Sequence, residues 1–224
     1  MNDIVYVYKQ SGDGGQELKH SLRSLCNITH GKIFVVGDRE DWFSDHIIHI
    51  PAEHSSPASM VDTSFKWLQA CNDPRVSDDF YAFNDDFFIT EPTTIPVLHA
   101  NETDNLPISR HHNVVIRATG DWLRQHKGIT NPLNYSLHVP MLMNKQKRIA
   151  VHHMIEATLG TMTPLEARTV YGNIYNIGGE FYQDAKTYGQ QLPSATFIST
   201  MEYTPELAQL FKEESIYEAI NTNQ

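Results

Sequence analysis

The stretch that decides the fold runs IVYVY over Ile4–Tyr8, ELKHSLRSLC over Glu17–Cys26 and KIFVV over Lys32–Val36. The first and last of these segments are short β-branched and aromatic runs, which are typical of buried strands. The middle segment places Leu18 and Leu22 at helical spacing, so it predicts a helix with one apolar face. Strand, helix and strand in this order form a βαβ unit, which indicates an α/β fold.

The same alternation continues outward from this unit. No repeat or linker divides the chain, so we expect a single domain over residues 1–224, with a mixed central sheet flanked by helices. Residues Pro92–Pro107 are expected to be irregular, and Tyr135–Met143 extended. Further strands are expected over Ile47–Ile50, Phe80–Phe83, Phe87–Ile89 and Thr196–Thr200, and helices within Ser55–Ala70, Val114–Lys127, Ile149–Leu159 and Thr204–Ile220.

The composition is that of an ordinary globular protein, because 40% of the 224 residues are hydrophobic and 20% are charged. No apolar run approaches the ~20 residues that span a bilayer, and the N-terminus lacks the regions of a signal peptide. The two cysteines, Cys26 and Cys71, exclude a disulfide scaffold and a cysteine-rich zinc site. We therefore expect a cytoplasmic protein without a membrane span.

The net charge of −10 speaks against a broad cationic surface for a polyanion, although it leaves a local phosphate pocket possible. Basic residues nevertheless crowd the middle of the chain, which keeps nucleic acid open as a partner. They are Arg110, Arg117, Arg124, Lys127, Lys145, Lys147 and Arg148.

The sharpest local feature is the run Phe83–Phe88, in which Asn84, Asp85 and Asp86 interrupt two aromatic segments. Buried carboxylates without a partner are costly, and a divalent cation offsets that cost. Mg²⁺ and Mn²⁺ prefer such oxygen ligands, and they also bridge nucleotide phosphates. The alternative is an exposed turn, which Asn and Asp favour.

Three other places are candidates for binding or catalysis. Lys19 and Arg23 share one face of the first helix and, with its N-terminus, could receive a diphosphate; the alternative is a solvated charged face. Asp38 ends the second strand, where ligands of open α/β sheets bind, unless it only caps a turn. His138 lies in an apolar stretch, as either a functional group or a satisfied core residue.

Several motifs in order resemble the Stealth family of sugar-phosphate transferases. They are DIVYVYK (Asp3–Lys9), ELKHSLRSL (Glu17–Leu25), KIFVVGD (Lys32–Asp38), DDFYAFNDDFF (Asp78–Phe88) and HVP (His138–Pro140). Short phage proteins described as glycosyltransferases look still more similar, and share the pattern RTVYGNIYNIGG (Arg168–Gly179) and a later Asp-x-Lys at Asp184–Lys186. The likeness covers most of residues 3–188.

The resemblance implies a GT-A-type, Rossmann-like nucleotide-sugar transferase. It implies a nucleotide- and metal-binding half over 1–90 and an acceptor-side half over 91–224. Asn84 stands in place of the first Asp of the usual Asp-x-Asp motif. The implied roles are nucleobase contact by Tyr6 and Tyr8, base or ribose recognition by Asp38, phosphate binding by Arg23, Arg168 and Lys186, cofactor binding by Asn84 as part of the acidic motif, metal binding by Asp86 and His138, and catalysis by Asp85 and His138.

The expected function is a Mn²⁺- or Mg²⁺-dependent glycosyltransferase in the cytoplasm of the producing or infected cell. It would move a sugar from a nucleotide-diphosphate sugar, first of all a UDP-sugar, to a hydroxyl group. That hydroxyl would belong to a hydroxymethylated pyrimidine of phage DNA or to a glycan. Two alternatives stay open: a Stealth-type sugar-1-phosphate transferase acting on a glycan, and a non-catalytic nucleotide-sugar or glycan-binding module.

Overall fold

The computed structural model describes residues 1–54, 59–106, 111–157, 165–187, 192–201 and 204–219. The largest sheet has five strands in the order β3-β2-β1-β4-β8. Strands β1 to β4 are mutually parallel and β8 is antiparallel to β4, so the expected mixed central sheet is confirmed. The strands are β1 (Asp3–Tyr8), β2 (Ile33–Gly37), β3 (Ile47–Pro51), β4 (Asp79–Asn84) and β8 (Met141–Asn144).

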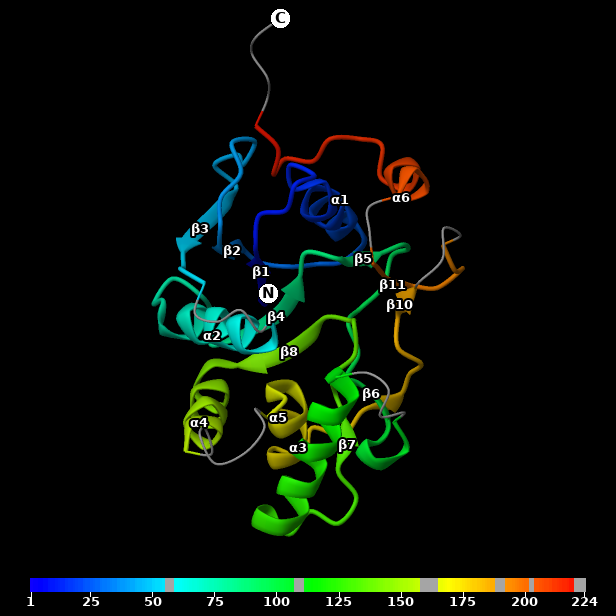
Figure 1. Ribbon diagram of the computed structural model, residues 1–224. Coiled ribbons are helices and arrows are strands. Elements are labelled where there is room, and N and C mark those ends of the chain that lie inside the picture. Colours follow the sequence, from blue (N-terminus) through cyan, green and yellow to red (C-terminus); the bar gives the residue numbers. More distant parts are fainter. Residues whose placement is uncertain (55–58, 107–110, 158–164, 188–191, 202–203, 220–224) are drawn as a thin grey trace, which may run out of the picture.

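Helices cover both faces of this sheet (Figure 1). Side chains of β1 alternate between the faces: Tyr6 packs with Leu18 and Leu22, whereas Val5 belongs to the core on the other side. The helices are α1 (Gln16–Ser24) on the first face, and α2 (Ser59–Asn72), α3 (His111–Lys127), α4 (Lys145–Glu156) and α5 (Ala167–Ile174) on the second. The α/β class with flanking helices is therefore confirmed.

Two smaller sheets complete the described fold. In one, β5 (Phe87–Ile89) pairs antiparallel with β11 (Phe197–Thr200), which pairs parallel with β10 (Lys186–Thr187). The chain passes from β4 to β5 through Asp85 and Asp86 alone, so the acidic motif lies where two sheets meet. The other sheet has the order β7-β6-β9, from β7 (Leu133–Asn134), β6 (Leu98–Glu102) and β9 (Glu180–Phe181).

The remaining elements are α6 (Pro205–Leu210) and two short 3-10 helices, η1 (Leu25–Asn27) and η2 (Thr103–Asn105). Thr204 caps α6 by accepting a hydrogen bond from Leu207 N at 3.2 Å, and Pro205 takes the first turn, as expected. The expected extension of this helix toward Ile220 is wrong. Beyond Leu210 the chain turns back instead, and Glu218 forms a bridge with Phe43.

One further expectation is wrong. Pro92–Pro107 is not wholly irregular, because β6 lies within it and is paired with strands from distant parts of the chain. Within Tyr135–Met143, the part up to Pro140 is a loop, and β8 begins at Met141 as an edge strand of the main sheet, which agrees with the position of Pro140. The helix expected over Ile149–Leu159 starts earlier, at Lys145, and ends at Glu156; residues 158 and 159 lie outside the described part.

Gly37 is the last residue of β2 and lies beside Tyr8, the last residue of β1. Its φ is +125°, and a Cβ atom there would lie 2.0 Å from Tyr8 O. Only glycine permits this approach, which leaves Tyr8 O accessible to the side chain of Lys66. No helix in the described residues is long and apolar enough to cross a membrane.

Candidate active site

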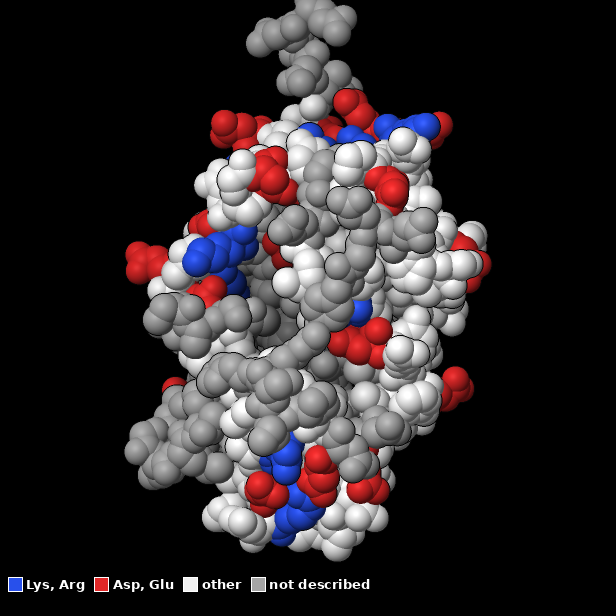
Figure 2. Space-filling model, turned by 45° about the vertical axis from the view of Figure 1, so that its right-hand side comes forward, with Lys and Arg blue, Asp and Glu red and all other residues white. Residues whose placement is uncertain are grey.

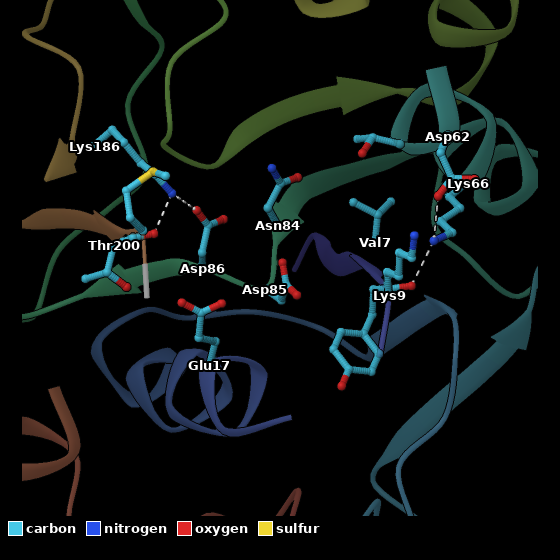
Figure 3. Close-up of a pocket in the computed structure, with 13 residues that line it drawn as sticks. Val7, Lys9, Glu17, Asp62, Lys66, Asn84, Asp85, Asp86, Lys186 and Thr200 are labelled. Atoms are coloured by element: carbon cyan, nitrogen blue, oxygen red, sulfur yellow. Dashed lines mark hydrogen bonds and ion pairs between the residues drawn. The ribbon is translucent and has the colours of Figure 1, made fainter. Parts of the chain in front are cut away.

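A cavity of about 320 Å³ lies at the carboxyl ends of β1 and β4. After β1 the chain leads to β2 and β3 on one side, and β4 then pairs on the other side of β1. Ligands of open α/β sheets bind at such a switch point. Figure 3 shows Asp85, Asp86 and Glu17 close together at one side of the cavity and Lys66 with Asp62 at the other.

Asp86 is held by residues that lie far away in sequence. Its Oδ2 accepts hydrogen bonds from Lys186 Nζ at 2.6 Å and from Ser199 Oγ at 2.7 Å. Lys186 also donates to Thr200 O. Strands β10 and β11 therefore place a cation against the acidic motif, and Lys186 and Thr200 line the first cavity although they belong to the half expected to serve the acceptor.

Asp85 and Glu17 line the same side of the first cavity as Asp86. Burial, together with the charges of Asp86 and Glu17, raises the pKa of Asp85 to about 8. Burial and the charge of Asp86 likewise raise the pKa of Glu17 to about 7, although Lys186 acts to lower it. The cavity thus concentrates carboxyl groups that a bound cation would stabilise in their charged form.

One polar atom in the cavity wall lacks a partner. Asn84 Oδ1 is buried and has no hydrogen-bond partner among the described residues, whereas the side chains of Glu17 and Thr200 contact each other. All three residues line the first cavity. Buried polar groups are normally paired, so Asn84 Oδ1 indicates a place where a ligand or water supplies the missing contact.

These residues fit a divalent cation that is shared with a ligand. Within the described residues, no group of three or more His, Cys, Asp or Glu side chains is arranged to hold a metal ion by itself. Asp85 and Asp86 nevertheless offer the oxygen ligands that Mg²⁺ and Mn²⁺ prefer. Phosphate oxygens commonly complete the coordination of such an ion.

The opposite end of the cavity contains Lys66, which was not predicted from the sequence. Its side chain is 2% exposed; Nζ lies 2.9 Å from Asp62 Oδ2 and donates to Tyr8 O at 2.9 Å. The ring of His54 lies 3.3 Å from Asp62 through Nδ1 and 3.3 Å from Asp38 through Nε2. The four-residue spacing of Asp62 and Lys66 in a helix was the available signal, although it is common in solvated helices.

The residues expected to contact the base are only partly brought to this cavity. Tyr8 lines it, and its hydroxyl donates to Glu40. Tyr6 is fully buried beneath, with its hydroxyl 2.9 Å from Ser21 Oγ and its ring against Phe83. Asp38 accepts from Gln10 N at 2.7 Å and is not among the described residues that line the cavity.

Lys19 and Arg23 face the C-terminal segment. Arg23 donates from Nε and Nη2 to the two oxygens of Glu218, both at 2.7 Å. Lys19 lies 3.8 Å from Glu218, and its ammonium lies over the Trp42 ring at 4.9 Å. Neither basic side chain is among the described residues that line the first cavity.

The N-terminus of α1 is occupied by the protein itself. Asp13 accepts from Gly15 N at 3.0 Å and from Glu17 N at 3.3 Å. This carboxylate therefore occupies two of the amide groups that were expected to receive a diphosphate.

A second cavity of about 230 Å³ adjoins the first, and Thr63 and Asn84 line both. His138 lines the second cavity, with its Nδ1 2.8 Å from Asp184 Oδ2. Burial acts to raise the pKa of Asp184, but the hydrogen bonds from His138 outweigh it and hold that pKa below its usual value. His138 and Asp86 thus line two neighbouring cavities that share Thr63 and Asn84.

Arg168 also lies at the second cavity, where it holds the chain on either side of His138. It donates to Leu137 O at 2.6 Å and to Val139 O at 2.7 Å. Burial lowers the pKa of this guanidinium to about 10, although the charges of Glu166 and Asp184 act to raise it. Arg168 therefore acts on the position of the His138 loop.

Among the basic residues of the middle of the chain, Arg110 lies outside the described residues, and Arg124, Lys145 and Arg148 are already bonded within the protein. Arg148 is fully buried and donates to Ser64 O, and Lys145 is 7% exposed and donates to Asp73 O. Arg124 forms ion pairs with Asp104 and Asp121. On the face in Figure 2, Lys and Arg side chains are interspersed with Asp and Glu.

No protein-family model matches the sequence, and no curated protein matches it. Among solved structures, the apo form of the glycosyltransferase GlyE of Streptococcus pneumoniae TIGR4 is similar to this chain, with a TM-score of 0.42 and 12% identity. The match covers 83% of this chain and 46% of that one. A second GlyE structure gives a TM-score of 0.41 and 10% identity over 78% and 43% of the two chains. This chain thus spans less than half of GlyE, and at these values its function has to be argued from the site.

Proposed function

We propose that this protein is a glycosyltransferase that binds a nucleotide-diphosphate sugar in the first cavity and transfers the sugar to a hydroxyl group. The observation that supports this most is the meeting of Asp85, Asp86 and Glu17 with Lys186 at the switch point of the sheet. The unpaired amide oxygen of Asn84 in the same wall, among the described residues, adds to it. The ordered motifs of the sequence point to the same class.

The donor diphosphate needs positive charge, which the cavity can supply in two ways. Lys186 and Lys66 present ammonium groups at its two ends, and Lys9 lines the wall between them. Asp85 and Asp86 would hold Mg²⁺ or Mn²⁺. The cation would stabilise the charge that develops on the diphosphate as it leaves.

The proton of the acceptor hydroxyl needs a base, and His138 suits this role better than Asp85. Asp184 holds Nδ1 of His138, which fixes the ring so that Nε2 is the atom left to accept a proton. Asp85 lies instead among the carboxyl groups of the first cavity, where it would coordinate the cation. Because His138 lines the neighbouring cavity, we propose it as the base and assign the cation to the first cavity.

The proposed transfer joins the acceptor oxygen to the anomeric carbon of the sugar. The bond from that carbon to the diphosphate oxygen breaks, and its electron pair leaves with the nucleoside diphosphate. The acceptor proton passes to Nε2 of His138. The base and the leaving-group contacts therefore come from two adjoining cavities, with Asn84 between them.

A donor panel tests this proposal. The protein is incubated with UDP-, GDP-, ADP- and TDP-sugars, Mn²⁺ or Mg²⁺, and acceptors of two kinds, neutral oligosaccharides and hydroxymethylated DNA. Release of a nucleoside diphosphate together with a glycosylated product supports the proposal. A nucleoside monophosphate would indicate sugar-1-phosphate transfer instead. Binding without any turnover would leave only a binding module.

A further inference from the structure

We propose that the second cavity is the acceptor subsite and that it binds one uncharged sugar ring of a glycan. The inference deepens the proposed function and rests on it for the direction of transfer. The cavity is next to the first one and shares Thr63 and Asn84 with it. A group bound there would therefore lie beside the donor site and against His138.

The size of the second cavity suits a small group. Pockets for drug-sized ligands have volumes of about 300–1,000 Å³. At about 230 Å³, this cavity is smaller than that range, as expected for a single ring. Trp67, Phe87 and Leu137 give it apolar walls, against which the carbon faces of a sugar can pack.

Two unpaired polar atoms indicate what chemistry the occupant brings. Trp67 is 4% exposed, and its Nε1 donor has no hydrogen-bond partner among the described residues. Asn84 Oδ1, an acceptor, is likewise buried and unpaired in the described part of the chain. A hydroxyl group both donates and accepts, so an occupant with several hydroxyls can satisfy both atoms.

The charge of the cavity argues against a nucleic acid. Arg168 is the only Lys or Arg among the described residues that line it, and its guanidinium already donates to Leu137 O and Val139 O. Glu166 is also engaged, because it accepts from Arg168 N at 3.2 Å and from Thr169 N at 2.6 Å. Nucleic-acid binding depends mainly on cations that contact phosphates, and this wall offers none that is not already bonded in the described residues.

Ligand-detected NMR tests the inference directly. The probes are the methyl glycosides of glucose, galactose and N-acetylglucosamine, and a single-stranded DNA oligonucleotide that carries 5-hydroxymethylcytosine. Ser136→Phe and Met60→Trp each place a large side chain in the second cavity, and thermal melting checks that each variant is folded. Asp86→Asn is the matched variant that alters only the first cavity. UDP binding in Mn²⁺ is measured on the same samples.

The expected result is that at least one methyl glycoside binds, that both filling variants reduce the signal at least about tenfold, and that Asp86→Asn retains it. No binding of any glycoside, or binding that survives both filling variants, would overturn the inference. DNA binding that the filling variants abolish would overturn it in favour of a base-binding cavity. If the glycoside binds as expected but UDP does not bind the wild type, the proposed function fails while the sugar site stands.

Discussion

Lys186 Nζ lies 2.6 Å from Asp86 Oδ2, although 100 residues separate the two along the chain. The contact joins the acidic motif after β4 to the short strand β10 of another sheet. Asp86 also accepts from Ser199 on β11, at 2.7 Å. The acidic motif is therefore partly buried and held by distant residues, which a solvated turn would not be.

The first prediction concerns Asp86. Replacing it by Asn keeps the shape and an acceptor for Lys186, but removes the negative charge that would hold the cation. We expect kcat/KM for sugar transfer to fall at least about 100-fold, which is the scale of losing one electrostatic contact to the leaving group. The exposed Asp41 provides the control, since Asp41→Asn should leave transfer unchanged. Equal activity of the two variants would remove Asp86 from the site.

The second prediction concerns pH. The pKa values of Asp85 and Glu17 are raised to about 8 and about 7, mainly by burial and then by the charge of Asp86. A carboxyl with a raised pKa favours the folded state while it is protonated, and this contribution is lost as the pH rises through the raised value. In EDTA, the melting temperature should therefore fall from about pH 5 to about pH 8.5.

The variant Asp85→Asn isolates this effect, because it cannot ionise. Its melting temperature should change less with pH over the same range than that of the wild type. Added Mn²⁺ should stabilise the wild type more at the upper end of the range, where the carboxyl groups are charged. If the melting temperatures of the two proteins changed equally with pH, the placement of Asp85 among the carboxyl groups of the first cavity would be contradicted.

The third prediction concerns Arg23, which forms a two-bond ion pair with Glu218 and whose side chain is 13% exposed. Breaking a mostly buried pair from one side leaves the other charge uncompensated, so Arg23→Ala should lower the free energy of unfolding by about 3 kcal/mol. Arg75 forms an exposed pair with Asp73, and Arg75→Ala should lower the free energy of unfolding far less, because exposed ion pairs contribute little to stability. Denaturant titration compares them.

Donor binding by the same variant separates two roles for Arg23. Because Arg23 does not line the first cavity in the described residues, UDP affinity should be unchanged in folded Arg23→Ala. A large loss of UDP affinity in a folded sample would instead favour the phosphate clamp that the motif resemblance implies.

The fourth prediction concerns Asp184, which positions His138 and does not act on the substrate itself. In Asp184→Asn the side-chain amide no longer favours the His138 tautomer that keeps Nε2 free to accept a proton. We expect kcat to fall about 10²–10⁴-fold, the usual contribution of a general base, with UDP affinity unchanged. Asp45→Asn, at an exposed position, is the control. An unchanged pH–rate profile in Asp184→Asn would show that His138 is not the base.

Much of the fold could be predicted because each core strand is encoded by a short contiguous run of apolar residues. IVYVY and IFVV consist of β-branched and aromatic residues, and they lie in β1 and β2, which are buried on both faces. In contrast, β6 reads LHANE and becomes a strand only through its pairing with β7 and β9. Contacts between distant segments of this kind leave no local pattern.

The candidate site divides in the same way. Asn84, Asp85 and Asp86 could be predicted, because polar residues between aromatic runs are unusual. Glu17, in the first turn of α1, could not be distinguished from an ordinary helix-start acid. Asp184 became significant only when the fold placed it against His138, 46 residues away.

The most direct measurement for the central claim is a crystal structure of the protein with UDP and Mn²⁺, recorded with anomalous data for manganese. We predict an anomalous peak between Asp86, Asp85 and the diphosphate, with the nucleotide extending along the first cavity past Lys66. A manganese peak away from Asp86, or a nucleotide bound outside the first cavity, would contradict the account.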